Sequence, residues 1–140
     1  MTIIFDFNRT LYDPETDSAV EGAREALNMC RMRGFAMHLV SRREPGRPEA
    51  LIELGMDRYF ESITFVDDKK HAIEELVSAA ETSAYVVGDH LFSEIRAGNK
   101  AGARTIWLKR GKFSELEPEG PDDVPWKTIE HLDELRELMS

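Results

Sequence analysis

The sequence predicts an α/β fold in which a doubly wound parallel sheet of five to six strands lies between two layers of helices. Short apolar runs rich in β-branched residues alternate with segments of helical period, and the runs are apolar on both faces. Strands of that kind are typical of parallel sheets covered by helices on each side. In such folds ligands bind at the carboxyl ends of the strands.

The expected strands occupy residues 2–5, 36–40, 62–66, 84–87 and 104–108, with a weaker edge strand at 127–129. The first helix has the clearest boundaries, because Ser18-Ala19-Val20-Glu21 has the pattern of a capping box and Gly34 can terminate a helix. Pro48 and Gly55 bound the second helix. The remaining helices are expected at 70–80, at 93–101 before Gly102, and at 130–139.

Length and charge restrict the classes of function. A chain of 140 residues fits one domain, residues 1–140. The net charge of -9 disfavours nucleic acid and anionic membrane surfaces as partners. Cys30 is the one cysteine, which excludes an internal disulfide, and the apolar run at 3–5 is too short for a signal sequence or a membrane span. We therefore expect a cytoplasmic protein without membrane association.

Chemically competent side chains follow four of the expected strands. Each of them alone fits an ordinary turn or helix start, but a phosphoryl-transfer site needs several such groups to converge at one sheet edge. In chain order they are Asp6, Ser41, Lys69, and Asp89 with Glu94. Their order and their placement at strand ends favour a common site.

The stretch Ile3-Ile4-Phe5-Asp6-Phe7-Asn8-Arg9-Thr10-Leu11 resembles the opening motif of the haloacid dehalogenase-like (HAD) hydrolases, in which Asp-x-Asp-x-Thr-Leu follows a hydrophobic run. Gly88-Asp89, with Glu94 five residues later and Ala101-Gly102-Ala103 before an apolar strand, is similar to a later motif of the same family. The turn at 54–61 also resembles family members, and only residues 111–126 lack a counterpart. The resemblance implies a Rossmann-like HAD fold.

The resemblance also implies a reaction and a set of roles. Asp6 would attack phosphorus and form an aspartyl-phosphate that water then hydrolyses. Ser41 and Lys69 would bind the phosphate. Apart from the resemblance, Arg42, with Arg43 and Arg9, places positive charge at the strand ends, which suits an anionic substrate. Lys69 is preferred to Lys70 because it follows the strand directly, before the helix fixes side-chain direction. Mg²⁺ would be held by Asp6, the backbone carbonyl of Asn8, Asp89 and Glu94.

Asn8 departs from the motif, because family members with Asp at this position use it as general acid and base. An amide can do neither, and such help is typically worth about 10²–10⁴-fold in rate. Three interpretations follow: slow hydrolysis or a preference for good leaving groups, a long-lived aspartyl-phosphate as in the related P-type ATPases, or binding without catalysis. His90 is a further candidate proton donor, although a loop histidine is the plainer interpretation.

The segments at 12–35 and 42–61 are too short to hold a cap domain, so we expect an open, capless site. A large substrate or a second subunit would then have to close it, which favours a homo-oligomer. Two other classes stay open. One is a phosphate-binding HAD module without activity. The other is a receiver domain, with Asp67 and Lys109 as its phosphate acceptor and lysine.

Overall fold

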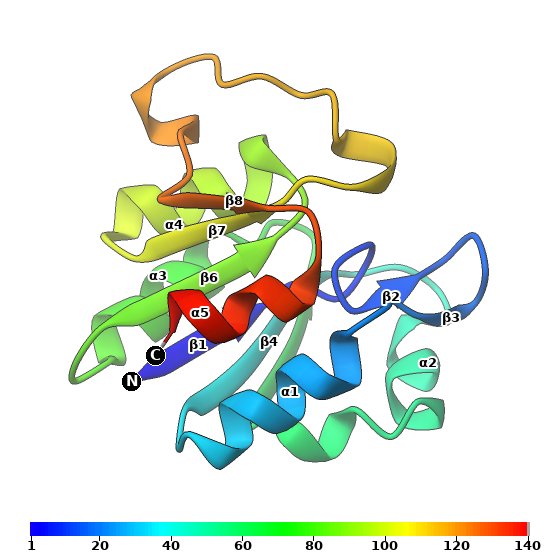
Figure 1. Ribbon diagram of the computed structural model, residues 1–140. Helices are drawn as coiled ribbons and strands as arrows, with labels where there is room; N and C mark the ends of the chain where they lie inside the picture. The colour runs from blue at the N-terminus through cyan, green and yellow to red at the C-terminus, as the bar shows by residue number, and fades with distance from the viewer. Residues whose placement is uncertain (140) are drawn as a thin grey trace.

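The main sheet has six parallel strands in the order β5-β4-β1-β6-β7-β8 in the computed structural model, which describes residues 1–139 (Figure 1). The strands are β1 (Thr2–Phe5), β4 (Ala36–Arg42), β5 (Ser62–Val66), β6 (Ala84–Gly88), β7 (Arg104–Leu108) and β8 (Lys127–Ile129). The chain winds outward from β1 to β5 on one side, then returns to β6 and winds outward again. The predicted doubly wound α/β sheet is therefore confirmed, with β4 and β6 slightly longer than expected.

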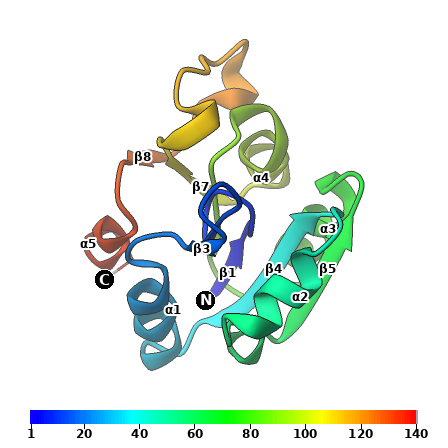
Figure 2. The ribbon, with the colours of Figure 1, turned by 90° about the vertical axis from the view of Figure 1, so that its right-hand side faces the viewer.

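Helices cover both faces of the sheet. Helices α1 (Ala23–Met32) and α5 (Leu135–Leu138) lie on one side, and α3 (Lys70–Ala79) and α4 (Arg96–Ala101) on the other (Figure 2). Helix α2 (Arg47–Glu53) adds Leu51 to the core beneath α1. Side chains of β1 alternate between the two cores, with Ile3 and Phe5 facing α1 and Ile4 facing α3.

The predicted capping box at Ser18-Ala19-Val20-Glu21 is wrong. Ser18 and Ala19 form β3 (Ser18–Ala19), which pairs with β2 (Tyr12–Asp13) in a short antiparallel hairpin. The Ser18 hydroxyl hydrogen-bonds Thr16 at 2.7 Å. Helix α1 begins after Gly22, whose φ of 83° lies in the left-handed region that glycine adopts readily. Strand pairing thus overrides the local capping signal.

Two other helices differ from expectation. The segment expected as one helix at 93–101 begins as a π-helical turn at Leu91–Ile95, and α4 follows it. The helix expected at 130–139 is reduced to a 3₁₀ turn at Leu132–Glu134 and the single turn of α5. The Glu134 carboxylate accepts from the N–H groups of residues 130 and 131, so these two residues form the cap rather than helix.

The connections between strands hold no inserted domain within residues 1–139. The β1 to β4 connection contains only the hairpin and α1, and the β4 to β5 connection contains α2 and a 3₁₀ turn at Asp57–Tyr59. The β7 to β8 connection carries two 3₁₀ turns, Gly111–Phe113 and Pro121–Asp123, and an ion pair between Arg96 and buried Asp123 anchors the second at 2.6 Å. Among the described helices, none combines the length and hydrophobicity that crossing a membrane requires.

Candidate active site

An open cavity of about 430 Å³ lies at the carboxyl ends of the central strands. This is the edge where α/β sheets bind ligands. The cavity is lined by Asp6, Asn8, Arg9, Arg42, Glu44, Asp67, Asp68, Lys69, Asp89, His90, Ser93, Lys112 and Phe113. Four of the proposed site residues after β1, β5 and β6 therefore share one cavity, together with Arg42 at the end of β4.

Lys69 joins two buried carboxylates at the floor of this cavity. Its Nζ lies 3.1 Å from Asp6 Oδ1 and 2.7 Å from Glu94 Oε1. Asp6 and Glu94 are almost fully buried, and the Lys69 side chain is 10% exposed. Ion pairs removed from water in this way hold their partners in fixed geometry. The structure thus places Lys69 beside Asp6, whereas Lys70 is exposed on α3.

Asp89 completes a group of three acidic residues. One oxygen from each of Asp6, Asp89 and Glu94 lies within 4.8 Å of the others. Asp89 Oδ2 is buried and has no hydrogen-bond partner within residues 1–139, while Trp107 Nε1 donates to the Asp89 backbone carbonyl at 2.9 Å and fixes its position. Three hard oxygen donors, one of them unpaired, face one ammonium group. This donor set fits Mg²⁺.

Burial and mutual repulsion shift the acidity of this group. Burial raises the pKa of Asp89 to about 9, and the charges of Glu94 and Asp6 add to the effect. Burial likewise raises the pKa of Asp6 to about 6, against the attraction of Lys69. The pKa of Glu94 is lowered despite its burial, because Lys69 and the His90 N–H group stabilise the charged form. The pKa of Lys69 is raised, since the attraction of Asp6 and Glu94 outweighs its own burial.

These shifts predict how the stability of the metal-free protein depends on pH. Between about pH 4 and pH 9 the folded chain holds more protons on Asp6 and Asp89 than the unfolded chain, because both folded pKa values are raised. The free energy of unfolding should therefore fall as pH rises through this range. We expect the melting temperature in EDTA to be lower at pH 9 than at pH 5, and Mg²⁺ to stabilise most at the higher pH, where its ligands are ionised.

The matched control is Asp89→Asn, which should flatten the pH dependence in EDTA. A melting temperature in EDTA that rises steadily from pH 5 to pH 9 in the unmodified protein would contradict the assignment of raised pKa values.

Backbone geometry after β6 positions Glu94. The π-helical turn at Leu91–Ile95 carries Glu94, and its Oε2 accepts from the His90 N–H group at 2.8 Å. Turns of this type are frequent at functional sites. Gly88 leaves the necessary space, because a Cβ built there would lie 2.2 Å from the Glu94 side chain.

Gly88→Ala should therefore displace Glu94. We expect the free energy of unfolding to fall by about 2 kcal/mol or more, and Mg²⁺ affinity to fall by about 10-fold or more. Chemical denaturation and calorimetry measure the two effects. Gly120→Ala is the control, since a Cβ at Gly120 meets nothing within 4 Å among the described residues and φ there is -167°. Equal stability of the two variants would contradict the steric argument.

Asn8 is fixed by a charged pair that the sequence did not reveal. Arg47 Nε donates to Asn8 Oδ1 at 2.6 Å, and Asn8 Nδ2 donates to Glu44 Oε2 at 2.8 Å. Arg47 also pairs with Glu44 at 3.0 Å, which closes a cycle of three side chains. Because Arg47 can only donate and an ionised Glu44 can only accept, these partners define the orientation of the amide. Glu44 brings a carboxylate into the cavity next to position 8.

The other predicted residues have distinct positions. Ser41 is fully buried, its Oγ has no hydrogen-bond partner within residues 1–139, and Ser41 does not line the cavity as the described chain is arranged. Arg42 is exposed at the cavity edge. Asp67 pairs loosely with Arg43 at 3.6 Å and is 83% exposed. Glu44, Arg47 and Phe113 were not predicted, because they lie in connections that carry no motif.

Comparison with known proteins identifies relatives. Residues 65–135, half of the chain, match the HAD-hydrolase-like family model. A glyceraldehyde 3-phosphate phosphatase of Methanopyrus kandleri is 34% identical over 103 residues, covering 64% of this chain and 44% of the relative. One from Pyrococcus furiosus is 28% identical over 131 residues, covering 86% and 54%. The chain spans about half the length of these curated relatives.

Solved structures share the fold at low identity. The D,D-heptose 1,7-bisphosphate phosphatase of B. bronchiseptica, complexed with magnesium and phosphate, has a TM-score of 0.74 at 13% identity and covers 99% of this chain and 97% of its own. The HAD-hydrolase YfnB of Bacillus subtilis, bound to magnesium, has a TM-score of 0.70 at 20% identity over 89% and 57%. With the family match and the observed fold, the chain belongs to the HAD-like hydrolase family.

Proposed function

We propose that the chain is a Mg²⁺-dependent phosphohydrolase that forms an aspartyl-phosphate on Asp6, with Asn8 making turnover slow or selective. The observation that carries this proposal is the floor of the cavity. There Asp6 lies 3.1 Å from Lys69 Nζ, and Asp89 Oδ2 is buried without a hydrogen-bond partner among residues 1–139. The floor thus brings together the nucleophile Asp6, the cation Lys69 that neutralises it, and a set of oxygen donors that lacks a partner.

The side chains divide the work. Asp6, the Asn8 carbonyl, Asp89 and Glu94 would hold Mg²⁺, which when bound reduces the repulsion between a carboxylate and a phosphate. Lys69 lowers the negative charge on Asp6 and on the incoming phosphate. The buried Ser41 hydroxyl is the predicted donor to a phosphate oxygen, and Arg42 at the edge favours an anionic substrate.

Asn8 and its partners decide which substrates react. The amide cannot protonate a leaving oxygen, so esters with poor leaving groups should react slowly. Acyl and aryl phosphates need little protonation and should react faster. The named relatives act on a small phosphate ester, which supports a small phosphorylated metabolite as substrate class. The proposal includes action as one domain in the cytoplasm, without nucleic-acid or membrane partners. It also includes a homo-oligomer, in which a second subunit closes the open site.

The test is phosphate release from acetyl phosphate, para-nitrophenyl phosphate and an alkyl phosphate, with Mg²⁺ and with EDTA. We expect Mg²⁺-dependent release that is fastest with acetyl phosphate. Absence of release from all three, with no phosphoryl adduct found by mass spectrometry, would contradict the hydrolase proposal.

A second candidate is a phosphate-binding or switch-like module that acts through a protein partner. The closed cycle of Asn8, Glu44 and Arg47 favours it, because both ends of the amide are already occupied. A stable adduct on Asp6 without turnover would favour this alternative over the hydrolase.

A further inference from the structure

One wall of the cavity is built around the ring of Phe113. The Arg9 guanidinium lies 5.6 Å from the ring centroid, and Lys112 Nζ lies 5.4 Å from it. The His90 ring packs on the same side chain with a centroid distance of 4.2 Å. These four residues, which we call the cationic wall, come from the turns after β1, β6 and β7, and all four line the cavity.

The two cations of the wall have no acidic partner. Within residues 1–139, neither Arg9 nor Lys112 makes an ion pair or a side-chain hydrogen bond, and the charged group of each lies over the Phe113 ring. An aromatic face attracts a cation but does not neutralise it. The acidic residues that line the cavity beyond its floor, Asp67, Asp68 and Glu44, lie after β5 and β4 on the opposite side of β1. That side also carries Arg42 at the end of β4, whereas the cationic wall itself contains no carboxylate.

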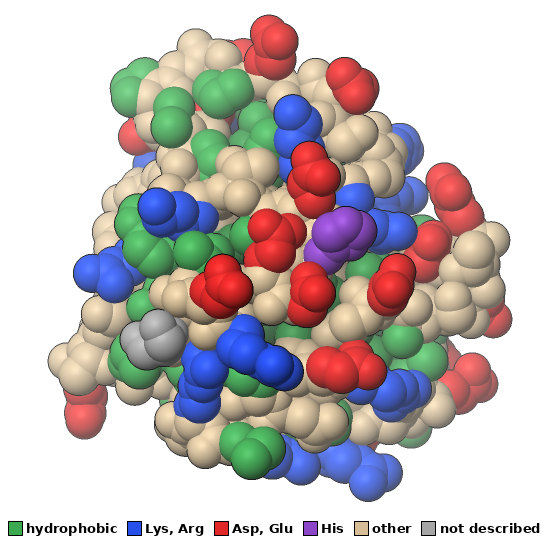
Figure 3. All heavy atoms as spheres, in the orientation of Figure 1, with side chains coloured by type: hydrophobic (Ala, Val, Ile, Leu, Met, Phe, Trp, Pro, Cys, Tyr) green, Lys and Arg blue, Asp and Glu red, His purple; other side chains and the backbone are tan. Residues whose placement is uncertain are grey.

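The charge of this wall contrasts with the rest of the molecule. The chain carries a net charge of -9, and the face formed by α1 and α5 shows acidic side chains interspersed with Lys and Arg (Figure 3). A ligand with several negative charges is repelled by such a surface and attracted only where unpaired cations lie. The ring contacts hold Arg9 and Lys112 in place before binding, which lowers the entropy lost when an anion binds.

Backbone strain at Arg9 is an independent observation. Arg9 has φ of 61°, in the left-handed region, and its N–H group donates to the Tyr12 carbonyl at 2.6 Å. Glycine would adopt this conformation without strain, and arginine does not. Strained residues of this kind cluster at functional sites. The presence of a strained arginine at this position is explained if its side chain binds a ligand.

We propose that the cationic wall binds a second anionic group, a carboxylate or a second phosphate, on the carbon skeleton of the phosphate ester. This inference rests on the proposed function and specifies its substrate class. The phosphate that is cleaved lies at Asp6 and Lys69, and the second anion lies between Arg9 and Lys112. Each cation can supply a charge-assisted hydrogen bond to that group.

Three esters with the same three-carbon skeleton test the proposal. These are 3-hydroxypropyl phosphate with a neutral end, 3-phosphooxypropanoate with a carboxylate, and 1,3-propanediol bisphosphate. The quantity compared is the ratio of kcat/KM for each anionic ester to that for the neutral ester, which cancels changes common to all substrates. We expect a ratio of about 10 or more in the unmodified protein. The larger of the two ratios identifies the second anion as carboxylate or phosphate.

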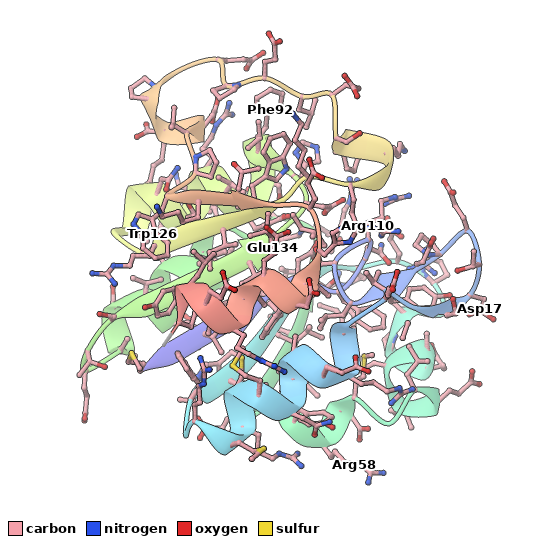
Figure 4. The ribbon with its side chains drawn as sticks, in the orientation of Figure 1. Asp17, Arg58, Phe92, Arg110, Trp126 and Glu134 are labelled. Atoms are coloured by element: carbon pink, nitrogen blue, oxygen red, sulfur yellow. The ribbon has the colours of Figure 1, made fainter. Side chains whose placement is uncertain are left out.

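Arg9→Gly is the decisive variant, because it removes the cation and relieves the backbone strain. We expect it to keep or raise the melting temperature while the ratio falls to about 1–3, and Lys112→Ala to lower the ratio in the same direction. Arg58→Ala is the matched control. Arg58 is exposed and points into solvent beneath α1, far from Arg110, which marks the exit of β7 that leads to Lys112 and Phe113 (Figure 4). Arg58→Ala should therefore leave the ratio unchanged.

Three outcomes would overturn the proposal: equal kcat/KM for neutral and anionic esters in the unmodified protein, a ratio unaffected by Arg9→Gly, or a ratio lost equally in Arg58→Ala. If no ester is hydrolysed, the proposed function is rejected, but the cationic wall can still be tested. Calorimetric titration of the same esters into Asp6→Asn measures whether the wall binds the second anionic group. A Kd preference for the anionic esters that Arg9→Gly removes supports the wall, and equal Kd values reject it.

Discussion

Replacing Asp6 by Asn should abolish phosphate release and adduct formation, with a loss of at least about 10³-fold in kcat. The amide is nearly the same size but has no anionic oxygen to attack phosphorus. Lys69 keeps its 2.7 Å contact with Glu94, so the buried cation remains paired. We therefore expect the fold to persist, and measurement of released phosphate together with the melting temperature separates lost chemistry from lost structure.

Asp67→Asn is the matched control, because Asp67 lines the same cavity but is 83% exposed. The nucleophile assignment predicts that Asp67→Asn still forms the adduct. If Asp67→Asn loses the adduct and Asp6→Asn retains it, the site works in the manner of a receiver domain.

Asn8→Asp alone should raise the rate on alkyl phosphates by less than about 10-fold, although it restores the carboxyl group of the family motif. The reason is Glu44, whose Oε2 lies 2.8 Å from Asn8 Nδ2. Two carboxylates in this position repel each other, and neither can work freely as acid and base. The double variant Asn8→Asp, Glu44→Gln preserves the net charge. Its glutamine amide at position 44 can donate a hydrogen bond to the new carboxylate at position 8, which reverses the direction of the present hydrogen bond.

For this double variant we expect a gain of about 10²-fold on alkyl phosphates, near the lower end of general acid-base contributions because Arg47 still binds the side chain at position 8. The gain on acetyl phosphate should be much smaller, since its leaving group needs little protonation. Steady-state kinetics of the two single variants and the double variant measure the coupling. An Asn8→Asp enzyme as active as the double variant would show that Glu44 does not restrict position 8.

Local sequence patterns predicted regular elements better than they predicted boundaries set by distant contacts. Five strands of the main sheet could be predicted because each contains a short, mainly apolar run between turn residues, whereas the edge strand β8, Lys127–Ile129, has a weaker signal. The capping box at Ser18 failed because that residue pairs with Asp13 in a hairpin, a partner that a local pattern does not identify. The π-helical turn at Leu91–Ile95 was missed for a similar reason, as its geometry accommodates Glu94 against Gly88.

The sequence by itself determined the family resemblance, the sheet, and a set of side chains at strand ends that includes Asp6, Lys69 and Asp89. It could do so because parallel strands bring their carboxyl ends to one edge whatever the connections do. Only the tertiary structure showed that Glu44 and Arg47 hydrogen-bond the amide of Asn8. It alone also showed that two cations without acidic partners lie over the Phe113 ring. These partners are 36 or more residues apart or lie in irregular connections, and only folding brings them into contact.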